Sequence, residues 1–193
     1  SQRCIEAATP VIERWLSTGR IVPAPAGCPY NNPLTVAPKK DDHGQLTGFR
    51  VCLDVRRLNL AIVEPDQFQI PIIREVLNNL QGCTIFAEFD LAEAYLQFPL
   101  HPESQPLTAF TWGHQQYMFA ACPFGLCNMP SHFQRVIASV FRDYSFTHPY
   151  FDNIPFGSHT WDEHATHTLA ILERLNHYNL KLKPGSMKIG QAE

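Results

Sequence analysis

Two aspartates stand at positions where strands could present them for metal chemistry. Asp90 ends the apolar run C-T-I-F-A-E-F-D, and Asp152 lies within the aromatic segment Y-F-D-N. A carboxylate in or at the end of a buried strand costs free energy unless a metal or another partner compensates its charge. Two carboxylates at the ends of adjacent strands would suit one or two Mg²⁺ ions, which phosphoryl-transfer enzymes require. Alternatively, each aspartate caps a turn, and the pair alone leaves both interpretations open.

The chain predicts an α+β fold, in which helices and antiparallel strands position these residues without strict βαβ alternation. Apolar periodicity and capping signals predict helices over 10–18, 71–82, 130–141 and 161–178. Apolar runs bounded by turn residues predict strands over 34–38, 50–54, 83–90, 107–111, 117–120, 180–183 and 187–189. The segment 150–157 resembles a hairpin, and the polar stretch 39–48 is expected to be the tip of another.

The expected helices carry specific predictions about caps and buried faces. Thr9 and Thr160 are expected to be N-caps, and Gly19 is expected to end the first helix. The apolar spacing predicts buried faces that comprise Ile72, Ile73, Val76, Leu77 and Leu80 in the second helix, Phe133, Val136, Ile137, Val140 and Phe141 in the third, and Ala165, Leu169, Leu172 and Leu175 in the last.

Length and composition indicate a folded protein with one core or two small subdomains. The 193 residues are 45% hydrophobic, which excludes a disordered chain, and no apolar run is long enough for a membrane span. Six scattered cysteines without a C-x-x-C pair predict free thiols and an intracellular protein. The formal charge of −3 means that a nucleic-acid partner would need a local basic surface.

A series of motifs gives the chain a family resemblance. They follow one another as V-A-P-K-K-D, F-R-V-C-L-D-V-R-R-L-N, F-D-L-A-E-A-Y, T-A-F-T, C-P-F-G-L-C-N-M-P-S-H-F-Q-R, Y-F-D-N-I and T-W-D-E-H-A-T-H. In this order the chain resembles the reverse transcriptases of long-terminal-repeat retrotransposons, the Ty3/gypsy group in particular. The resemblance implies the fingers and palm of a right-hand polymerase, with an antiparallel palm sheet packed by helices. It places the fingers at 1–63 and 98–128 and the palm at 64–97 and 129–193, without thumb, connection or ribonuclease H regions.

The resemblance also implies roles for residues of the palm. Asp90, the Leu91 carbonyl and Asp152 would hold two Mg²⁺ or Mn²⁺ ions that activate a primer 3′-hydroxyl and neutralise a triphosphate. Tyr95 matches the aromatic gate beneath the incoming sugar, where a ring leaves no room for a 2′-hydroxyl. Ordinary core packing is the alternative for Tyr95.

In the fingers, the resemblance implies a site for the incoming deoxynucleotide triphosphate. Lys40 (or Lys39) and Arg50 match the cations that hold the triphosphate, and Arg suits this role because its guanidinium binds in a bidentate manner. Phe124 and Gly125 match the strip that lines the nucleotide pocket. For the two lysines, a solvated hairpin tip is the alternative.

The chain departs from the family pattern beside the second aspartate. Asn153 occupies the place of the second aspartate of Y-x-D-D and removes one negative charge from the expected metal site. Pro155 and Gly157 are expected to distort the strand that follows. We therefore expect a degenerate, domesticated copy with impaired synthesis, retained for nucleic-acid or protein binding. The alternatives are an active polymerase fragment on an RNA template and DNA primer duplex, and a purely structural interaction module; no membrane partner is expected.

Two other groups of side chains have the spacing of metal ligands. Cys122, Cys127 and His132, with His114 or His101, have spacings that zinc tolerates, but they surround the P-F-G-L strip, and we do not favour a zinc site there. His164 and His167 also have a metal-compatible spacing, but we interpret their segment as a helix start.

Overall fold

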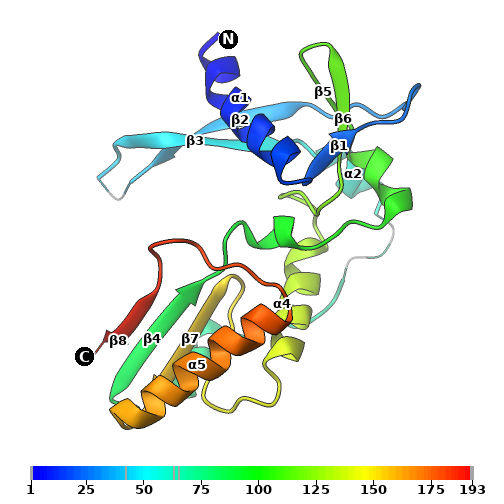
Figure 1. Cartoon of the computed structure of the whole chain (residues 1–193). Helices are drawn as coiled ribbons and strands as arrows, with labels where there is room; N and C mark the ends of the chain where they lie inside the picture. The colour runs from blue at the N-terminus through cyan, green and yellow to red at the C-terminus, as the bar shows by residue number, and fades with distance from the viewer. Residues whose placement is uncertain (1, 42, 63, 65, 192–193) are drawn as a thin grey trace. The chain divides into compact units, whose positions relative to one another are not determined.

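The structure is a computed structural model that describes residues 2–41, 43–62, 64 and 66–191. Residues 1, 63 and 193 are ends of the expected fingers and palm segments, and they lie outside the described residues, as do residues 42, 65 and 192. The chain forms two compact units, Ser1–Pro65 with Phe98–Met129, and Asp66–Gln97 with Pro130–Glu193. Helices and antiparallel strands occur in both units, which confirms the α+β class (Figure 1). No helix in the described ranges is long and apolar enough to cross a membrane.

The first unit contains two small antiparallel sheets. Its elements are α1 (Gln2–Ser17), β1 (Ile21–Pro23), β2 (Leu34–Lys40), β3 (Leu46–Leu53), α2 (Arg56–Leu60), η2 (Pro102–Thr108), β5 (Phe110–Trp112) and β6 (Gln115–Phe119). One sheet has the order β1-β6-β5, and β2 pairs with β3 in the other. The turn between β5 and β6 contains Gly113, whose φ of 60° suits glycine.

Helix α1 begins earlier than predicted. Thr9 is not the N-cap, because it lies inside the helix and its hydroxyl donates to the Ile5 carbonyl at 2.8 Å. The helix packs through an apolar face that includes Ile12 and Trp15, and the Trp15 ring meets Phe119 edge-on. Burial of this face stabilises the helix although Pro10 lies inside it. The helix ends before Gly19, as predicted.

The β2–β3 hairpin is longer than predicted, so its tip is shorter. Pairing continues to Lys39 opposite Gly48 and Lys40 opposite Leu46, with a register shift between the two lysines. The Asp41 carboxylate then accepts hydrogen bonds from the backbone of His43 and Gln45, at 3.0 and 2.8 Å. This local capping closes the tip and lets both strands extend beyond the apolar residues.

The second unit is a three-stranded antiparallel sheet packed by helices. Its elements are α3 (Ile73–Asn78), β4 (Ile85–Asp90), η1 (Ala94–Gln97), α4 (Met129–Val140), β7 (Asn153–Ser158), α5 (Trp161–His177) and β8 (Lys188–Gln191). The strand order is β7-β4-β8, and α5 lies along one face of this sheet (Figure 1). Alternate residues of β4 are buried, with Ile85, Ala87 and Phe89 each at most 5% exposed. The central strand therefore has one core face and one more accessible face.

Two predicted helical faces are only partly right: Val76 of α3 and Leu175 of α5 are buried as predicted, whereas most of the other predicted residues are more exposed. In α3, only Val76 is buried, whereas Ile72, Ile73 and Leu77 are 63%, 57% and 60% exposed. This helix ends at Asn78, before Leu80, and is too short to bury a continuous apolar stripe.

The face of α5 is rotated relative to the prediction. His164, Ile171 and Leu175 are buried, whereas Ala165 is exposed and Leu169 is 60% exposed. A buried histidine was not expected, but His164 has hydrogen-bonding partners on β7 and β8. The predicted Thr160 cap is confirmed, because its side chain accepts from the Glu163 N–H.

Strand β7 is not distorted by Pro155 or Gly157, which corrects the prediction. β7 pairs with β4 without a break from Asn153 to Ser158. β7 is an edge strand, and the Pro155 carbonyl points away from β4, where it accepts a hydrogen bond from Thr147. The nitrogen of Pro155, which carries no hydrogen, faces the same outer side, so no hydrogen bond to β4 is lost. At Gly157, an added Cβ would lie 2.6 Å from the Cys83 sulfur, so glycine allows the two segments to approach closely.

Candidate active site

The two candidate aspartates come from adjacent strand ends of the second unit. Asp90 is the last residue of β4 and lies opposite Asn153 in the antiparallel register with β7. The next backbone N–H along, that of Leu91, donates to the Asp152 carbonyl at 2.8 Å. The backbones of Asp90 and Asp152 are thus adjacent, with Asp152 exposed and Asp90 half-buried. This is the juxtaposition that a shared metal site would require.

A tight hairpin loop presents Asp152. Tyr150 and Asn153 exchange backbone hydrogen bonds of 2.9 and 3.1 Å, so that Phe151 and Asp152 form the loop. Phe151 has a φ of 51°, which is uncommon for a residue other than glycine. The buried Gln134 side chain of α4 stabilises this conformation: its oxygen accepts from the Phe151 N–H at 2.7 Å, and its nitrogen donates to the Pro149 carbonyl at 2.8 Å.

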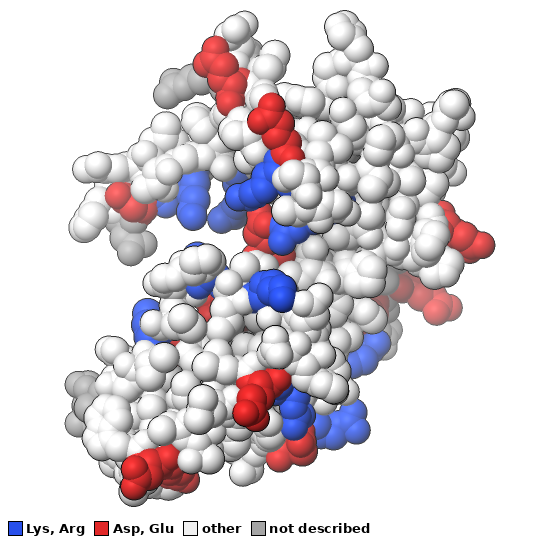
Figure 2. Space-filling model, viewed as in Figure 1, with Lys and Arg blue, Asp and Glu red and all other residues white. Residues whose placement is uncertain are grey.

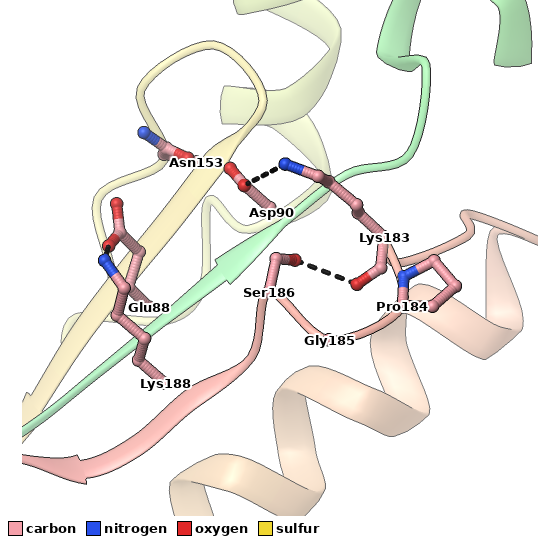
Figure 3. Close-up of a pocket in the computed structure, with 8 residues that line it drawn as sticks. All are labelled: Glu88, Asp90, Asn153, Lys183, Pro184, Gly185, Ser186 and Lys188. Carbon is pink, nitrogen blue, oxygen red and sulfur yellow. Dashed lines mark hydrogen bonds and ion pairs between the residues drawn. The ribbon is translucent and has the colours of Figure 1, made fainter. Parts of the chain in front are cut away.

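Lysine side chains pair with both carboxylates on the accessible face of β4. The Lys183 ammonium lies 3.4 Å from Asp90 Oδ2, and the Lys188 ammonium lies 3.2 Å from Glu88 Oε2. Figure 3 shows the two pairs side by side. They line a pocket of about 380 Å³, which Asn153 also lines. Asp90 therefore already has a cation beside it.

Tyr95 lies near Asp152, on η1. Its ring packs edge-on against Phe133 with the ring centroids 5.3 Å apart. Burial, and then the negative charge of Asp152, raise the pKa of the Tyr95 hydroxyl, so it stays neutral at physiological pH. The Tyr95 side chain is thus half-buried against Phe133, and its charged neighbour is Asp152, one of the candidate aspartates.

The predicted triphosphate cations lie on the hairpin of the first unit. Arg50 of β3 lies opposite Ala37 of β2. Lys39 follows Ala37 by two residues on β2 and lies opposite Gly48. Because residues two apart on a strand share a face, Lys39 and Arg50 project from the same side of the hairpin. The register shift follows Lys39, so Lys40 is not placed on that face by the same rule. All three side chains are exposed.

The predicted nucleotide-pocket strip is held in place by Asn59. Its side chain donates to the Gly125 carbonyl at 2.8 Å and accepts from the Cys127 N–H at 3.0 Å. Gly125 has a φ of 99°, and a Cβ there would lie 3.1 Å from Val55. Phe124, the neighbouring residue, is 37% exposed. Glycine is therefore required by the loop conformation, and the aromatic side chain remains accessible.

The side chains of Asp90, Asp152 and Asn153 carry donor atoms of the kind that a hard divalent cation accepts. Two carboxylates and the Asn153 amide oxygen are ligands that Mg²⁺ and Mn²⁺ accept. In the part of the chain that the structure describes, no three His, Cys, Asp or Glu side chains gather to hold a metal. The zinc alternative at Cys122, Cys127 and His132 thus finds no support there.

The paired histidines of α5 have a structural arrangement. The Nδ1 atoms of His164 and His167 lie 3.0 and 2.9 Å from the same Ser158 hydroxyl. A single hydroxyl bridges the two rings, and it ties α5 to the end of β7.

Three contributing residues were not predicted from the sequence: Asn59, Gln134 and Lys183. The sequence did contain a signal for Gln134, a polar residue between the apolar Phe133 and Ile137 of a helix. A buried amide needs hydrogen-bonding partners, so this position indicated a polar contact inside the fold. The K-P-G-S sequence signalled the turn that carries Lys183, but not what its side chain contacts.

The chain matches one family model over residues 37–191, described as reverse transcriptase (RNA-dependent DNA polymerase). It is 34% identical over 174 residues to the retrovirus-related Pol polyprotein from transposon 297 of Drosophila melanogaster. That match covers 89% of this chain and 16% of the polyprotein. It is also 29% identical to the transposon Tf2-7 polyprotein of Schizosaccharomyces pombe, over 83% of this chain and 12% of that polyprotein. The chain therefore spans a small part of these relatives.

Solved structures share the fold. A foamy viral protease–reverse transcriptase in complex with double-stranded DNA superposes with a TM-score of 0.86 at 24% identity, covering 97% of this chain and 32% of that chain. The same viral protein in complex with an RNA/DNA hybrid gives a TM-score of 0.86 at 23% identity, covering 98% of this chain and 24% of that one. The predicted fingers–palm architecture is thereby confirmed.

Proposed function

The chain belongs to the reverse transcriptase (RNA-dependent DNA polymerase) family, and on this premise we propose that it is a retroelement-derived fingers–palm domain that binds a template–primer duplex but synthesises DNA poorly. The observation that carries this proposal is Asn153. It lies opposite Asp90 in the sheet, and the resemblance of the sequence motifs matches it to the second aspartate of the family's Y-x-D-D. The first unit would be the fingers and the second the palm.

The charges around Asp90 support impaired metal binding. Asp90 and Asp152 supply two negative charges, Asn153 supplies none, and Lys183 adds a positive charge 3.4 Å from Asp90. Mg²⁺ binds through hard, negatively charged oxygens and gives up its water reluctantly. A site with this charge balance would attract a divalent cation more weakly than one with a third carboxylate.

The remaining roles are proposed for residues within each unit. Asp90, Asp152 and the Leu91 carbonyl would hold the cation, which when bound would neutralise a triphosphate and lower the pKa of the primer hydroxyl. Lys39 and Arg50 share a hairpin face and would bind phosphate oxygens, while Phe124 and Gly125 would line the nucleotide pocket. Tyr95 would contact the sugar.

Primer extension on an RNA template tests the proposal. With Mg²⁺ and then Mn²⁺, we expect little product from the unchanged protein and at least about tenfold more from Asn153→Asp, because the added carboxylate favours the metal. Asn78→Asp, which adds the same charge on exposed α3, is the control and is expected to change nothing.

Duplex binding is measured on the same proteins. Binding of an RNA/DNA duplex with little extension agrees with the proposal. Extension by the unchanged protein at the level of Asn153→Asp would contradict the impairment, and a lack of duplex binding at low salt would favour the protein-interaction alternative instead.

A further inference from the structure

Lys183 is held in place by its own turn. Lys183, Pro184, Gly185 and Ser186 form a type II turn, with proline and a positive-φ glycine at its centre, where this turn prefers them. The Lys183 carbonyl accepts from the Ser186 N–H at 3.3 Å and from its hydroxyl at 2.8 Å. On the other side, the Lys183 N–H donates to the Asp90 carbonyl at 2.8 Å. The backbone of Lys183 is therefore fixed directly against the end of β4.

The side chain of Lys183 returns to the same residue. Figure 3 shows its ammonium directed at the Asp90 carboxylate, with 3.4 Å between Nζ and Oδ2. The Asp90 side chain is 29% exposed and that of Lys183 is 58% exposed. A lysine carries a compact charge on a flexible chain, so this ammonium can leave the carboxylate for the open pocket without any change in the backbone.

We infer that Lys183 acts as an internal counter-cation that occupies Asp90 and competes there with a divalent metal ion. A divalent cation that binds Asp90 must displace the ammonium, which costs free energy. This inference deepens the proposed function and rests on its assignment of Asp90 as a metal ligand. It names Lys183 as a residue that sets the metal affinity of the site.

Lys188 supplies a matched control within the same pocket. Its ammonium lies 3.2 Å from Glu88, two residues before Asp90 on the same face of β4, and its side chain is 67% exposed. Removal of either lysine changes the net charge of the protein by the same amount. A difference between the two variants therefore reports on the contact with Asp90 and not on overall charge.

Mn²⁺ affinity, measured by electron paramagnetic resonance on the whole chain, tests the inference. Lys183→Gln is expected to bind Mn²⁺ about two- to fivefold more tightly than the unchanged protein, the range expected for an exposed ion pair. Lys183→Arg, which keeps the charge, is expected to retain the original affinity, and Lys188→Gln to change it by less than about 1.5-fold. Circular dichroism checks that all the variants fold.

Asp90→Asn separates the failure of the inference from that of the proposed function. If Asp90→Asn weakens Mn²⁺ binding but Lys183→Gln and Lys188→Gln have equal affinities, only the inference is overturned. If Asp90→Asn leaves Mn²⁺ binding unchanged, the metal site itself is wrong and both fall. Neither result depends on DNA synthesis.

Amine labelling provides a second measurement on the unchanged protein. With an amine-reactive acylating reagent and mass spectrometry, added Mn²⁺ is expected to increase the labelling of Lys183 relative to Lys188, because the displaced ammonium is no longer held by Asp90. An unchanged ratio at saturating Mn²⁺ would overturn the inference.

Discussion

At the residue scale, the sequence predicted the candidate aspartates better than it predicted the residues that contact and position them. Asp90 is recognisable because a charge at the end of an apolar strand is unusual, and Asp152 because it lies within an aromatic segment; the structure brings their backbones together. Gln134 and Lys183 act through contacts with segments that are distant in the chain, at Pro149–Phe151 and at Asp90. Such contacts depend on tertiary packing, which local residue patterns do not specify.

Gln134 yields a stability prediction at this scale. Gln134→Met keeps the size of the side chain but leaves the Phe151 N–H and the Pro149 carbonyl without this partner, so we expect a loss of about 1–3 kcal/mol in the free energy of unfolding. Gln81→Met, at an exposed position, is expected to stay within about 0.5 kcal/mol. Urea unfolding measures both variants, and equal stabilities would contradict the assigned role of Gln134.

At the scale of elements, most helices and strands were predictable, whereas their ends and buried faces were not. β4 was predictable from its continuous apolar run, and α5 from its Thr160 cap. The buried face of α5 was mispredicted because His164, a polar residue, is buried through a chain of hydrogen bonds. The Gly190 N–H donates to His164 Nε2, which makes Nδ1 the protonated nitrogen that donates to Ser158. The Ser158 hydroxyl then donates to His167 Nδ1.

This chain of hydrogen bonds gives a prediction of pH dependence. Burial, and then the charge of His167, lower the pKa of His164 below its ordinary value of about 6.5. The folded state thus binds fewer protons than the unfolded state, so stability is full above pH ~6.5 and falls as the pH decreases. Protonation of His164 at Nε2 would also place an N–H group against the Gly190 N–H that donates to this nitrogen. The Glu163 carboxylate lies 3.9 Å from the other histidine, His167.

Thermal unfolding between pH 5 and pH 8 measures this effect. We expect His164→Gln to flatten the pH dependence of the melting temperature. His114→Gln, at an exposed position, is expected to keep the original slope. His148, whose pKa burial also lowers, contributes to the same slope and is expected to account for what remains. An unchanged slope in His164→Gln would show that this histidine is not the group responsible.

At the scale of the whole molecule, the charge is low and mixed. The formal charge is −3, and Figure 2 shows acidic and basic side chains interspersed on the visible face. Under the proposed function, duplex binding would therefore rely on a few local cations, and Lys39 and Arg50 are the pair that the hairpin register places on one face. Overall composition did not predict this pairing, since only the register between two strands defines it.

Salt dependence of duplex binding tests the contribution of this pair. The double substitution Lys39→Gln with Arg50→Gln is expected to reduce the slope of log affinity against log salt by about 1–2. The reason is that binding with fewer phosphate contacts releases fewer counterions from the duplex. Arg142→Gln, an exposed residue after α4, serves as the control and is expected to keep the slope. Equal slopes in all three proteins would exclude the hairpin cations from the interface.

The two-sided character of β4 has an evolutionary consequence. Ile85, Ala87 and Phe89 anchor the sheet to the core, whereas Glu88 and Asp90 face the accessible pocket. Substitutions on the pocket side can alter chemistry while the hydrophobic anchor is untouched. If the pocket is the site of the family's chemistry, selection on catalysis and selection on foldedness would act on different residues of the same strand. A copy of such a gene can lose its ancestral reaction and still encode a stable protein that is open to a new use.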